Sequence, residues 1–202
     1  VLGMLTDQYP QLVAVSGTHG KTTTTAMLTQ ILVEAGADPS AIIGGKLPLI
    51  GSNGRAGHSG TMVCEACEYV DTFLLLHPAV SLILNIEADH LDYFKNIDNI
   101  VKSFTQFASQ TSGRLVVNGG DPRAMAAVSG QRDKEVVTFG MDPSCDYYPT
   151  QLNEEPTACE DFTLTHQGAP LGRVNLSVPG KHNLLNALAA AAAAHSLGIS
   201  PE

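Results

Sequence analysis

The chain has 202 residues, of which 44% are hydrophobic and 15% charged, and its formal net charge is −9. This length suits one large domain or two small ones with a sizeable core. The acidic balance argues against nucleic acid as a main partner, because no stripe of Lys and Arg is present to neutralise phosphates. No apolar run is long enough to span a bilayer and no signal-peptide pattern is present, so no membrane partner is expected. The chain begins on Val1 rather than Met, and we therefore expect a fragment of a longer protein.

The stretch 12–24 predicts a phosphate-binding loop between a strand and a helix. An apolar run leads into Gly-Thr-His-Gly-Lys-Thr at 17–22, and a helical pattern follows. Glycines let backbone N–H groups turn inward, and the helix adds its first N–H groups and the positive end of its dipole. Lys21 would place its charge on the outer phosphates, and the Thr22 hydroxyl can ligate Mg²⁺. Val15 stands where the usual pattern has a glycine, so an ordinary glycine turn before a helix is the alternative.

Strand and helix patterns alternate over most of the chain. Strands are predicted at 12–16, 41–43, 61–65, 80–86, 114–118 and 135–139. Helices are predicted at 22–35, 70–76, 96–109 and 121–129. This alternation predicts an α/β fold of the P-loop NTPase type, with a mostly parallel sheet flanked by helices. The glycine-rich stretch 51–60 predicts a mobile surface loop.

The character of the sequence changes at about residue 145. Residues 145–178 alternate without helical patterns, which predicts a small antiparallel subsheet inserted into a single domain over 1–202. Its strands are expected at 146–152, 161–166 and 173–178. An alanine-rich helix then runs to about Leu197, where Gly198 ends it.

The four cysteines are Cys64, Cys67, Cys145 and Cys159. Cys64 and Cys67 form a C-x-x-C, which is also found in redox pairs and in half of a zinc site. No second pair stands at ligand spacing, and the motif follows a strand rather than opening a helix. We therefore expect small buried residues. Reduced thiols together with a nucleotide loop indicate a cytoplasmic protein.

Polar residues follow three of the predicted strands, at the edge where open α/β sheets bind ligands. They are the loop at 17–22, Glu65, and the pair Asp89 and His90. Beside Thr22, such a carboxylate and imidazole form a plausible Mg²⁺ environment. Taken alone, Glu65 is equally a solvated strand end, and His90 is more often a helix cap or a satisfied polar residue.

The last helix opens with Lys181-His182-Asn183, and Asn186 follows one turn later. Asn183 as a helix cap is the simpler interpretation. The alternative is that the two amides, on one helix face, pair with the donor and acceptor edge of a purine.

Together these stretches resemble the central ATPase domain of the Mur ligase family. The resemblance is carried by Gly-Thr-His-Gly-Lys-Thr-Thr at 17–23, Glu-Ala-Cys-Glu at 65–68, Asn-Ile-Glu-Ala-Asp-His-Leu-Asp at 85–92 and Gly-Lys-His-Asn-Leu-Leu-Asn-Ala at 180–187. It spans nearly the whole chain, and Val15 matches what this family shows. In having a His after the first Gly-Thr, the chain resembles the branch of the family that adds alanine.

The resemblance implies an ATP-dependent enzyme of three domains, of which this chain matches the central one. The N-terminal domain would hold a UDP-sugar and the C-terminal domain would bring the amino acid. The implied reaction joins L-alanine to UDP-N-acetylmuramate through an acyl phosphate, in peptidoglycan precursor synthesis. Alternatives are a sibling ligase that attaches a peptide to the same sugar, a non-catalytic nucleotide-binding module, and a P-loop kinase, which the lack of an arginine-rich lid disfavours.

The resemblance also implies roles for individual residues. Lys21 would stabilise the transferring phosphoryl charge, with Glu65 and His90 as further catalytic residues. Thr22 and Glu65 would hold one Mg²⁺, and His90 would hold or orient a second. The nucleotide contacts implied are Gly17, Thr18, His19, Gly20, Lys21, Thr22, Thr23, His182, Asn183 and Asn186. The substrate contacts implied are Gly45, Asn53 and Arg55.

Overall fold

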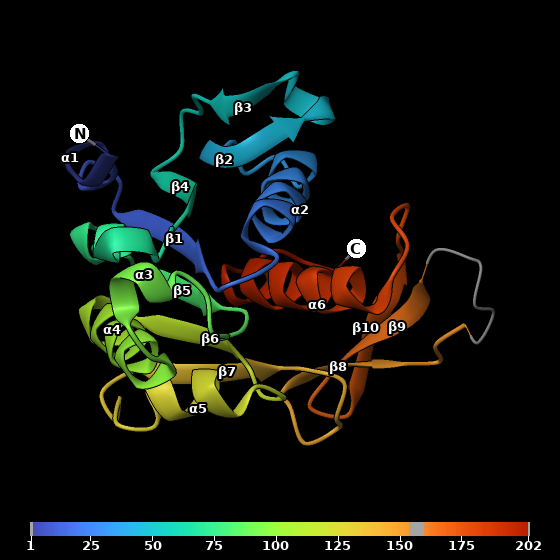
Figure 1. Ribbon diagram of the computed structural model, residues 1–202. Coiled ribbons are helices and arrows are strands. Elements are labelled where there is room, and N and C mark those ends of the chain that lie inside the picture. Colours follow the sequence, from blue (N-terminus) through green and yellow to red (C-terminus); the bar gives the residue numbers. More distant parts are fainter. Residues whose placement is uncertain (1, 154–159, 202) are drawn as a thin grey trace.

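One hydrogen-bonded sheet runs through the whole molecule (Figure 1). The computed structural model describes residues 2–153 and 160–201, so Cys159 and part of the predicted insertion lie outside the described residues. In space the ten strands follow the order β10-β9-β8-β7-β6-β5-β1-β4-β2-β3. Their bounds are β1 Gln11–Ser16, β2 Ser40–Leu47, β3 Ser52–Arg55, β4 Thr61–Glu65, β5 Val80–Ile83, β6 Arg114–Asn118, β7 Glu135–Phe139, β8 Tyr147–Thr150, β9 Asp161–His166 and β10 Ala169–Asn175.

Strand β1 lies at the centre of the parallel part of the sheet. It pairs with β4 on one side and with β5 on the other, so that Val13 lies opposite both Val63 and Val80. The segments that follow β1, β4 and β5 therefore leave the sheet side by side at its carboxyl edge. This arrangement brings together the loop at 17–22, Glu65 and the segment after β5.

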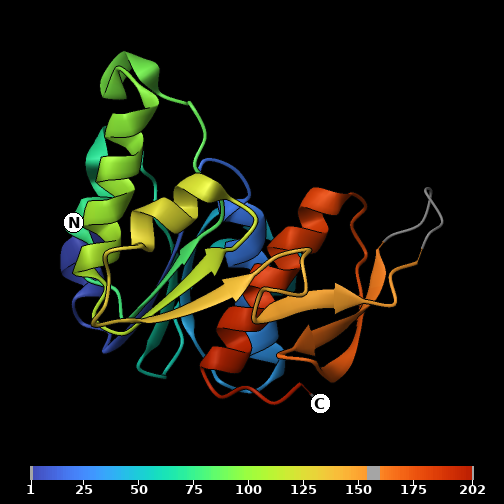
Figure 2. The ribbon, with the colours of Figure 1, turned by 90° about the horizontal axis from the view of Figure 1, so that it is seen from below.

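Helices cover both faces of the sheet (Figures 1 and 2). Their bounds, with those of the short 3₁₀ helices, are α1 Leu2–Thr6, α2 Lys21–Glu34, η1 Pro48–Ile50, η2 Tyr69–Leu75, α3 Leu91–Phe94, α4 Ile97–Gln110, α5 Pro122–Val128 and α6 Lys181–Ser196. Helices α2 and α6 pack on one face with Val13 and Val15 of β1. Helices α4 and α5 pack on the other face with Leu12 and Ala14. The alternation along β1 thus assigns neighbouring residues to opposite cores.

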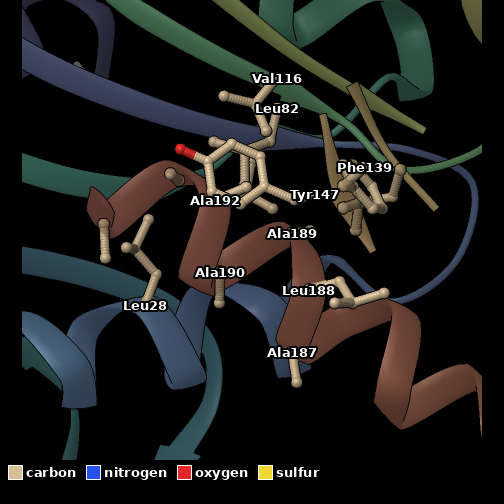
Figure 3. Packing of buried hydrophobic residues seen from close by; sticks show 14 of the residues in the cluster. Leu28, Leu82, Val116, Phe139, Tyr147, Ala187, Leu188, Ala189, Ala190 and Ala192 are labelled. Carbon is tan, nitrogen blue, oxygen red and sulfur yellow. The ribbon is translucent and has the colours of Figure 1, made fainter. Parts of the chain in front are cut away.

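The alanine-rich helix α6 is the centre of the first core (Figure 3). Ala189, Ala190 and Ala192 are fully buried between Leu28 of α2 and the strands. Small side chains let α6 approach both the sheet and α2 closely, and alanine has the highest helix propensity. The predicted helix is confirmed, and Gly198 follows its end with φ of 87°.

The glycine-rich stretch 51–60 is in part a strand, which corrects the predicted mobile loop. Ser52–Arg55 forms β3, antiparallel to β2, with Ala41 opposite Arg55. The Arg55 guanidinium donates to Asp38 Oδ1 at 2.5 Å, so a side-chain contact fixes a hairpin whose sequence has low strand propensity.

The strand predicted at 80–86 ends at Ile83. The Asn118 side chain donates to the Leu84 carbonyl at 3.0 Å, and Asn85 already bonds with the phosphate loop. The helix predicted at 70–76 is η2, with Val70 and Asp71 in the left-handed region at φ of 53° and 55°.

The prediction of buried cysteines is confirmed for Cys64 and wrong for Cys67, which is exposed; Cys145 is also buried. Cys67 lies beyond the end of β4, where the chain has left the sheet. Burial raises the pKa of the Cys64 thiol to about 12, so it is protonated and unreactive at neutral pH.

The antiparallel strands β8, β9 and β10 join the parallel sheet rather than forming a separate layer. β8 pairs with β7 through Phe139 and Tyr147, and β9 and β10 follow antiparallel. The predicted α/β class with a small antiparallel part is confirmed. Within the described ranges, no helix has both the length and the apolar composition needed to cross a membrane.

Candidate functional site

The loop between β1 and α2 depends on glycine at two positions. Gly17 has φ of 142° and Gly20 has φ of 86°, which side-chain-bearing residues rarely adopt. A Cβ on Gly20 would also collide with the side-chain oxygen of Asn186 on α6. Gly20 precedes α2 without a side-chain cap, so the first N–H groups of α2 have no intrahelical partner. With the positive end of the helix dipole they form a site for an anion.

The Lys21 side chain lies back over this loop. Its Nζ donates to the Gly17 carbonyl at 2.6 Å and, more weakly, to the Thr18 carbonyl at 3.3 Å. It also donates to both carboxylate oxygens of Glu68, at 2.8 and 3.1 Å. The side chains of Lys21 and Glu68 are only 14% and 3% exposed. The role of Glu68 was not predicted from the sequence, although Glu68 lies within the Glu-Ala-Cys-Glu motif.

Thr22 and Glu65 meet as predicted. The Thr22 hydroxyl donates to Glu65 Oε2 at 2.9 Å, and the backbone N–H of Gly44 donates to the same oxygen at 2.8 Å. A Cβ on Gly44 would collide with this carboxylate, and Gly45 lies beside the Thr22 methyl group. A hydroxyl and a carboxylate are the hard oxygen ligands that suit Mg²⁺, which usually keeps several waters. In the part of the chain that the structure describes, no three His, Cys, Asp or Glu residues are arranged as a metal site.

Asn85 fastens the loop to the segment after β5. The His19 N–H donates to Asn85 Oδ1 at 2.7 Å, and Asn85 Nδ2 donates to the His19 carbonyl at 3.0 Å. The Glu87 N–H donates to the Thr18 hydroxyl at 2.9 Å. These bonds hold the middle of the loop in place. This role of Asn85 was not predicted from the sequence, because only the adjacency of β1 and β5 creates it.

His90 lies beside this assembly, with φ of 50°. Its ring centroid is 4.5 Å from that of Tyr69, and its Nε2 is 3.9 Å from Asp89 Oδ2. Across residues 2–153 and 160–201, no hydrogen bond or ion pair joins His90 to Lys21, Thr22 or Glu65. Tyr69 directly follows Glu68, so His90 adjoins the segment that carries the partner of Lys21.

The start of α6 approaches the phosphate loop, as the nucleotide prediction requires. Gly180 caps this helix, so the interpretation of Asn183 as the cap is wrong. Asn183 Nδ2 instead donates to the Pro179 carbonyl at 2.8 Å, and Asn186 Nδ2 donates to Asn183 Oδ1 at 3.3 Å. The exposed ring of His182 folds back against Gly180. The two amides therefore share one face, with Asn186 against Gly20.

The predicted substrate contacts fall in two places. Gly45 adjoins Thr22, within the assembly. Asn53 and Arg55 lie on β3, at the edge of the sheet, and the Arg55 guanidinium is paired with Asp38. Hydrogen bonds from Arg55 and His58 lower the pKa of Asp38 to about 2, so this pair persists at neutral pH.

Known proteins resemble this chain in sequence and in fold. The family model of the Mur ligase middle domain matches residues 15–194. The UDP-N-acetylmuramate–L-alanine ligases of Agathobacter rectalis and Caldanaerobacter subterraneus subsp. tengcongensis are 46% and 43% identical over all of this chain. The chain spans 44% of the length of each.

Two solved structures share the fold. The UDP-N-acetylmuramate:L-alanyl-gamma-D-glutamyl-meso-diaminopimelate ligase from Neisseria meningitides matches all of this chain and 66% of its own, with a TM-score of 0.88 and 28% identity. The UDP-N-acetylmuramate-alanine ligase from Thermotoga maritima matches 96% of this chain and 43% of its own, with a TM-score of 0.81 and 29% identity.

Proposed function

The chain belongs to the Mur ligase family, and we propose that it is the central ATP-binding domain of a three-domain ligase. The proposed activity of the whole protein joins L-alanine to UDP-N-acetylmuramate, in peptidoglycan precursor synthesis. The observation that carries the proposal is that Lys21 and Thr22 open α2 directly after the glycine loop, with Glu65 bonded to the Thr22 hydroxyl. The choice of substrates is supported by the two relatives named UDP-N-acetylmuramate–L-alanine ligase, which are 46% and 43% identical over the whole chain. Separate N- and C-terminal domains would bind the UDP-sugar and the amino acid.

In the proposed reaction, the γ-phosphoryl group of ATP passes to the muramoyl carboxylate and ADP is left. The amine of L-alanine then attacks the acyl carbon of this mixed anhydride, loses a proton, and displaces phosphate. Lys21 and the first N–H groups of α2 would stabilise the negative charge on the transferring group. Mg²⁺ held by Thr22 and Glu65 would neutralise phosphate charge.

We propose the remaining roles on the same basis. Gly17, Thr18, His19, Gly20 and Thr23 would shape or line the phosphate site. His182, Asn183 and Asn186 would contact adenine. Gly45, Asn53 and Arg55 would lie where the muramoyl substrate enters. His90 would orient a second Mg²⁺, and it would do so without a direct bond to Thr22 or Glu65. We propose a cytoplasmic location, which the free thiols of Cys64, Cys67 and Cys145 support.

A second candidate is a ligase that attaches a peptide to the same sugar. The likeness to the Neisseria structure, whose name specifies a peptide acceptor, favours it. The identity of 28% to that protein is lower than the 46% to the alanine-adding relative.

An ADP-release assay on the full-length protein separates these candidates. The protein is given ATP, Mg²⁺ and UDP-N-acetylmuramate with L-alanine, glycine, L-serine or a tripeptide. We expect the highest kcat/KM with L-alanine. A preference for the tripeptide would replace the first candidate by the second, and ADP binding without turnover on any acceptor would reduce the chain to a nucleotide-binding module.

A further inference from the structure

We propose that Glu68 is the exchangeable counterion of Lys21. The Glu68 carboxylate pairs with the Lys21 ammonium group while no nucleotide is bound. When a nucleotide binds, one of its phosphates displaces the carboxylate from Lys21. The inference rests on the proposed nucleotide site and identifies a residue that limits the affinity of that site.

The bonds of the Lys21 ammonium group leave no room for a further acceptor. An ammonium has three protons to donate, and Nζ already faces four acceptors: the Gly17 carbonyl at 2.6 Å, the Glu68 oxygens at 2.8 and 3.1 Å, and the Thr18 carbonyl at 3.3 Å. A phosphate oxygen must therefore replace one of them. The two carbonyls belong to the loop backbone, so the side chain of Glu68 is the partner that can leave.

Charge makes Glu68 the partner that has to leave. The ion pair is largely shielded from water, with Glu68 only 3% exposed, so solvent screens repulsion at this position weakly. A phosphate group that reaches Lys21 brings negative charge against the Glu68 carboxylate. Throughout the described residues, Lys21 is the side chain that forms an ion pair with Glu68.

The backbone around Glu68 is suited to such an exchange. Its carbonyl accepts from the N–H of Asp71 at 3.0 Å in a turn where Val70 and Asp71 both have left-handed φ values. Left-handed conformations of non-glycine residues hold strain that a change of conformation can release. The side chain of Val70 is also 49% exposed, so it is not packed in the core.

The neighbouring carboxylate is bonded in a different way. Glu65 accepts hydrogen bonds from two neutral groups, the Thr22 hydroxyl and the Gly44 N–H. These bonds orient its carboxylate without neutralising it, as a metal ligand requires. Of two acids three residues apart, Glu65 thus remains available to a cation and Glu68 already holds one.

The test measures ADP binding to the full-length protein by calorimetry in the presence of EDTA. Glu68→Gln keeps the shape of the side chain and removes its charge. We expect the Kd for ADP to fall about tenfold, since one charge-assisted contact no longer has to be exchanged. The Kd for adenosine, which carries no phosphate, stays unchanged. A merely structural role of Glu68 would weaken both ligands.

Glu87→Gln is the matched control. Glu87 is a nearby acid whose side chain is 58% exposed. Its Oε2 lies 3.7 Å from His19 Nε2, and it forms no ion pair with Lys21 among the described residues. Its loss should change the Kd for ADP less than about twofold, because exposed charges are well screened. Glu68→Asp, which shortens the reach to Lys21, should tighten ADP binding to a smaller extent than Glu68→Gln and serves if the latter does not fold.

Unchanged or weaker ADP binding by the Glu68 variants would overturn the inference, as would equal tightening by Glu87→Gln. Failure of the unmodified protein to bind ADP would overturn the proposed function and this inference with it. ADP binding by the unmodified protein without tightening in the Glu68 variants would overturn the inference alone.

Discussion

The two edges of the parallel sheet both carry polar clusters, and the two clusters are bonded differently. At the carboxyl edge, the first two residues of α2 have acidic partners: Lys21 pairs with Glu68, and the Thr22 hydroxyl donates to Glu65. At the amino edge, the Tyr147 hydroxyl lies 2.7 Å from His195 Nδ1. The ring of Tyr147 stacks on His166, with centroids 4.3 Å apart.

The amino-edge cluster is bonded mainly within itself, although the buried Nε of Arg114 has no hydrogen-bond partner among the residues that the structure describes. The guanidinium of Arg114 donates to Glu135 at 2.6 Å and to the carbonyl of Ser196, at the end of α6. These contacts tie the starts of β6 and β7 to the last turn of α6. At the carboxyl edge, by contrast, α2 and α6 begin without a side-chain cap, and their first N–H groups have no intrahelical partner. Helix N-termini and an exchangeable ion-pair partner therefore distinguish the binding edge from the amino edge more clearly than the number of polar residues does.

Lys21→Ala should have the largest effect, because it removes the cation of the carboxyl edge. Loss of the charge that stabilises the transferring phosphoryl group should lower ligation by the full-length protein about a thousandfold. It should also lower the free energy of unfolding by about 3 kcal/mol, because Glu68 stays buried without its partner. Both are measured on one preparation, by ADP release and by urea unfolding.

The double variant Lys21→Ala with Glu68→Gln separates the two effects. It should recover most of the lost stability, because no buried charge remains, while ligation stays as low as in the single variant. Near-normal turnover by either variant would contradict the phosphate-site assignment.

The sequence predicted the parallel strands and the loop well, because their signals are local. The apolar run 12–16 followed by Gly17 and Gly20 specifies a buried strand and a turn with positive φ, whatever the rest of the chain does. Strand β3 was missed, since Asn53 and Gly54 have little strand propensity and Arg55 needs Asp38, 17 residues away, to fix the hairpin.

The pairs that distinguish the two edges could not be predicted from local patterns. Lys21 and Glu68 are 47 residues apart, and Tyr147 and His195 are 48 apart. Their contacts exist only because β1 lies beside β4, and β8 beside the end of α6. Nothing in the sequence around Glu68 shows which of two neighbouring acids faces the lysine.

Tyr147→Phe should weaken the amino edge and leave catalysis unchanged. It removes the hydroxyl bonded to His195 and keeps the buried ring, which is 3% exposed. We expect the free energy of unfolding to fall by about 1 kcal/mol, the usual worth of one such bond. Urea unfolding gives this loss, and the ADP-release rate provides the control. If ligation fell while the variant remained fully folded, the amino edge would also contribute to the reaction.

His166→Gln should reveal the smallest effect, a change in how stability depends on pH. Burial, and then the charge of nearby His195, hold the pKa of His166 below its usual 6.5, although Asp146 opposes this. The unfolded chain therefore takes up the proton at a higher pH than the folded one, so stability falls as pH drops through 6.5 towards the folded pKa. Unfolding measured at about pH 7.5 and about pH 5.5 should show a smaller loss in the variant than in the unmodified protein. An equal loss in both would assign the acid sensitivity to groups outside the amino edge.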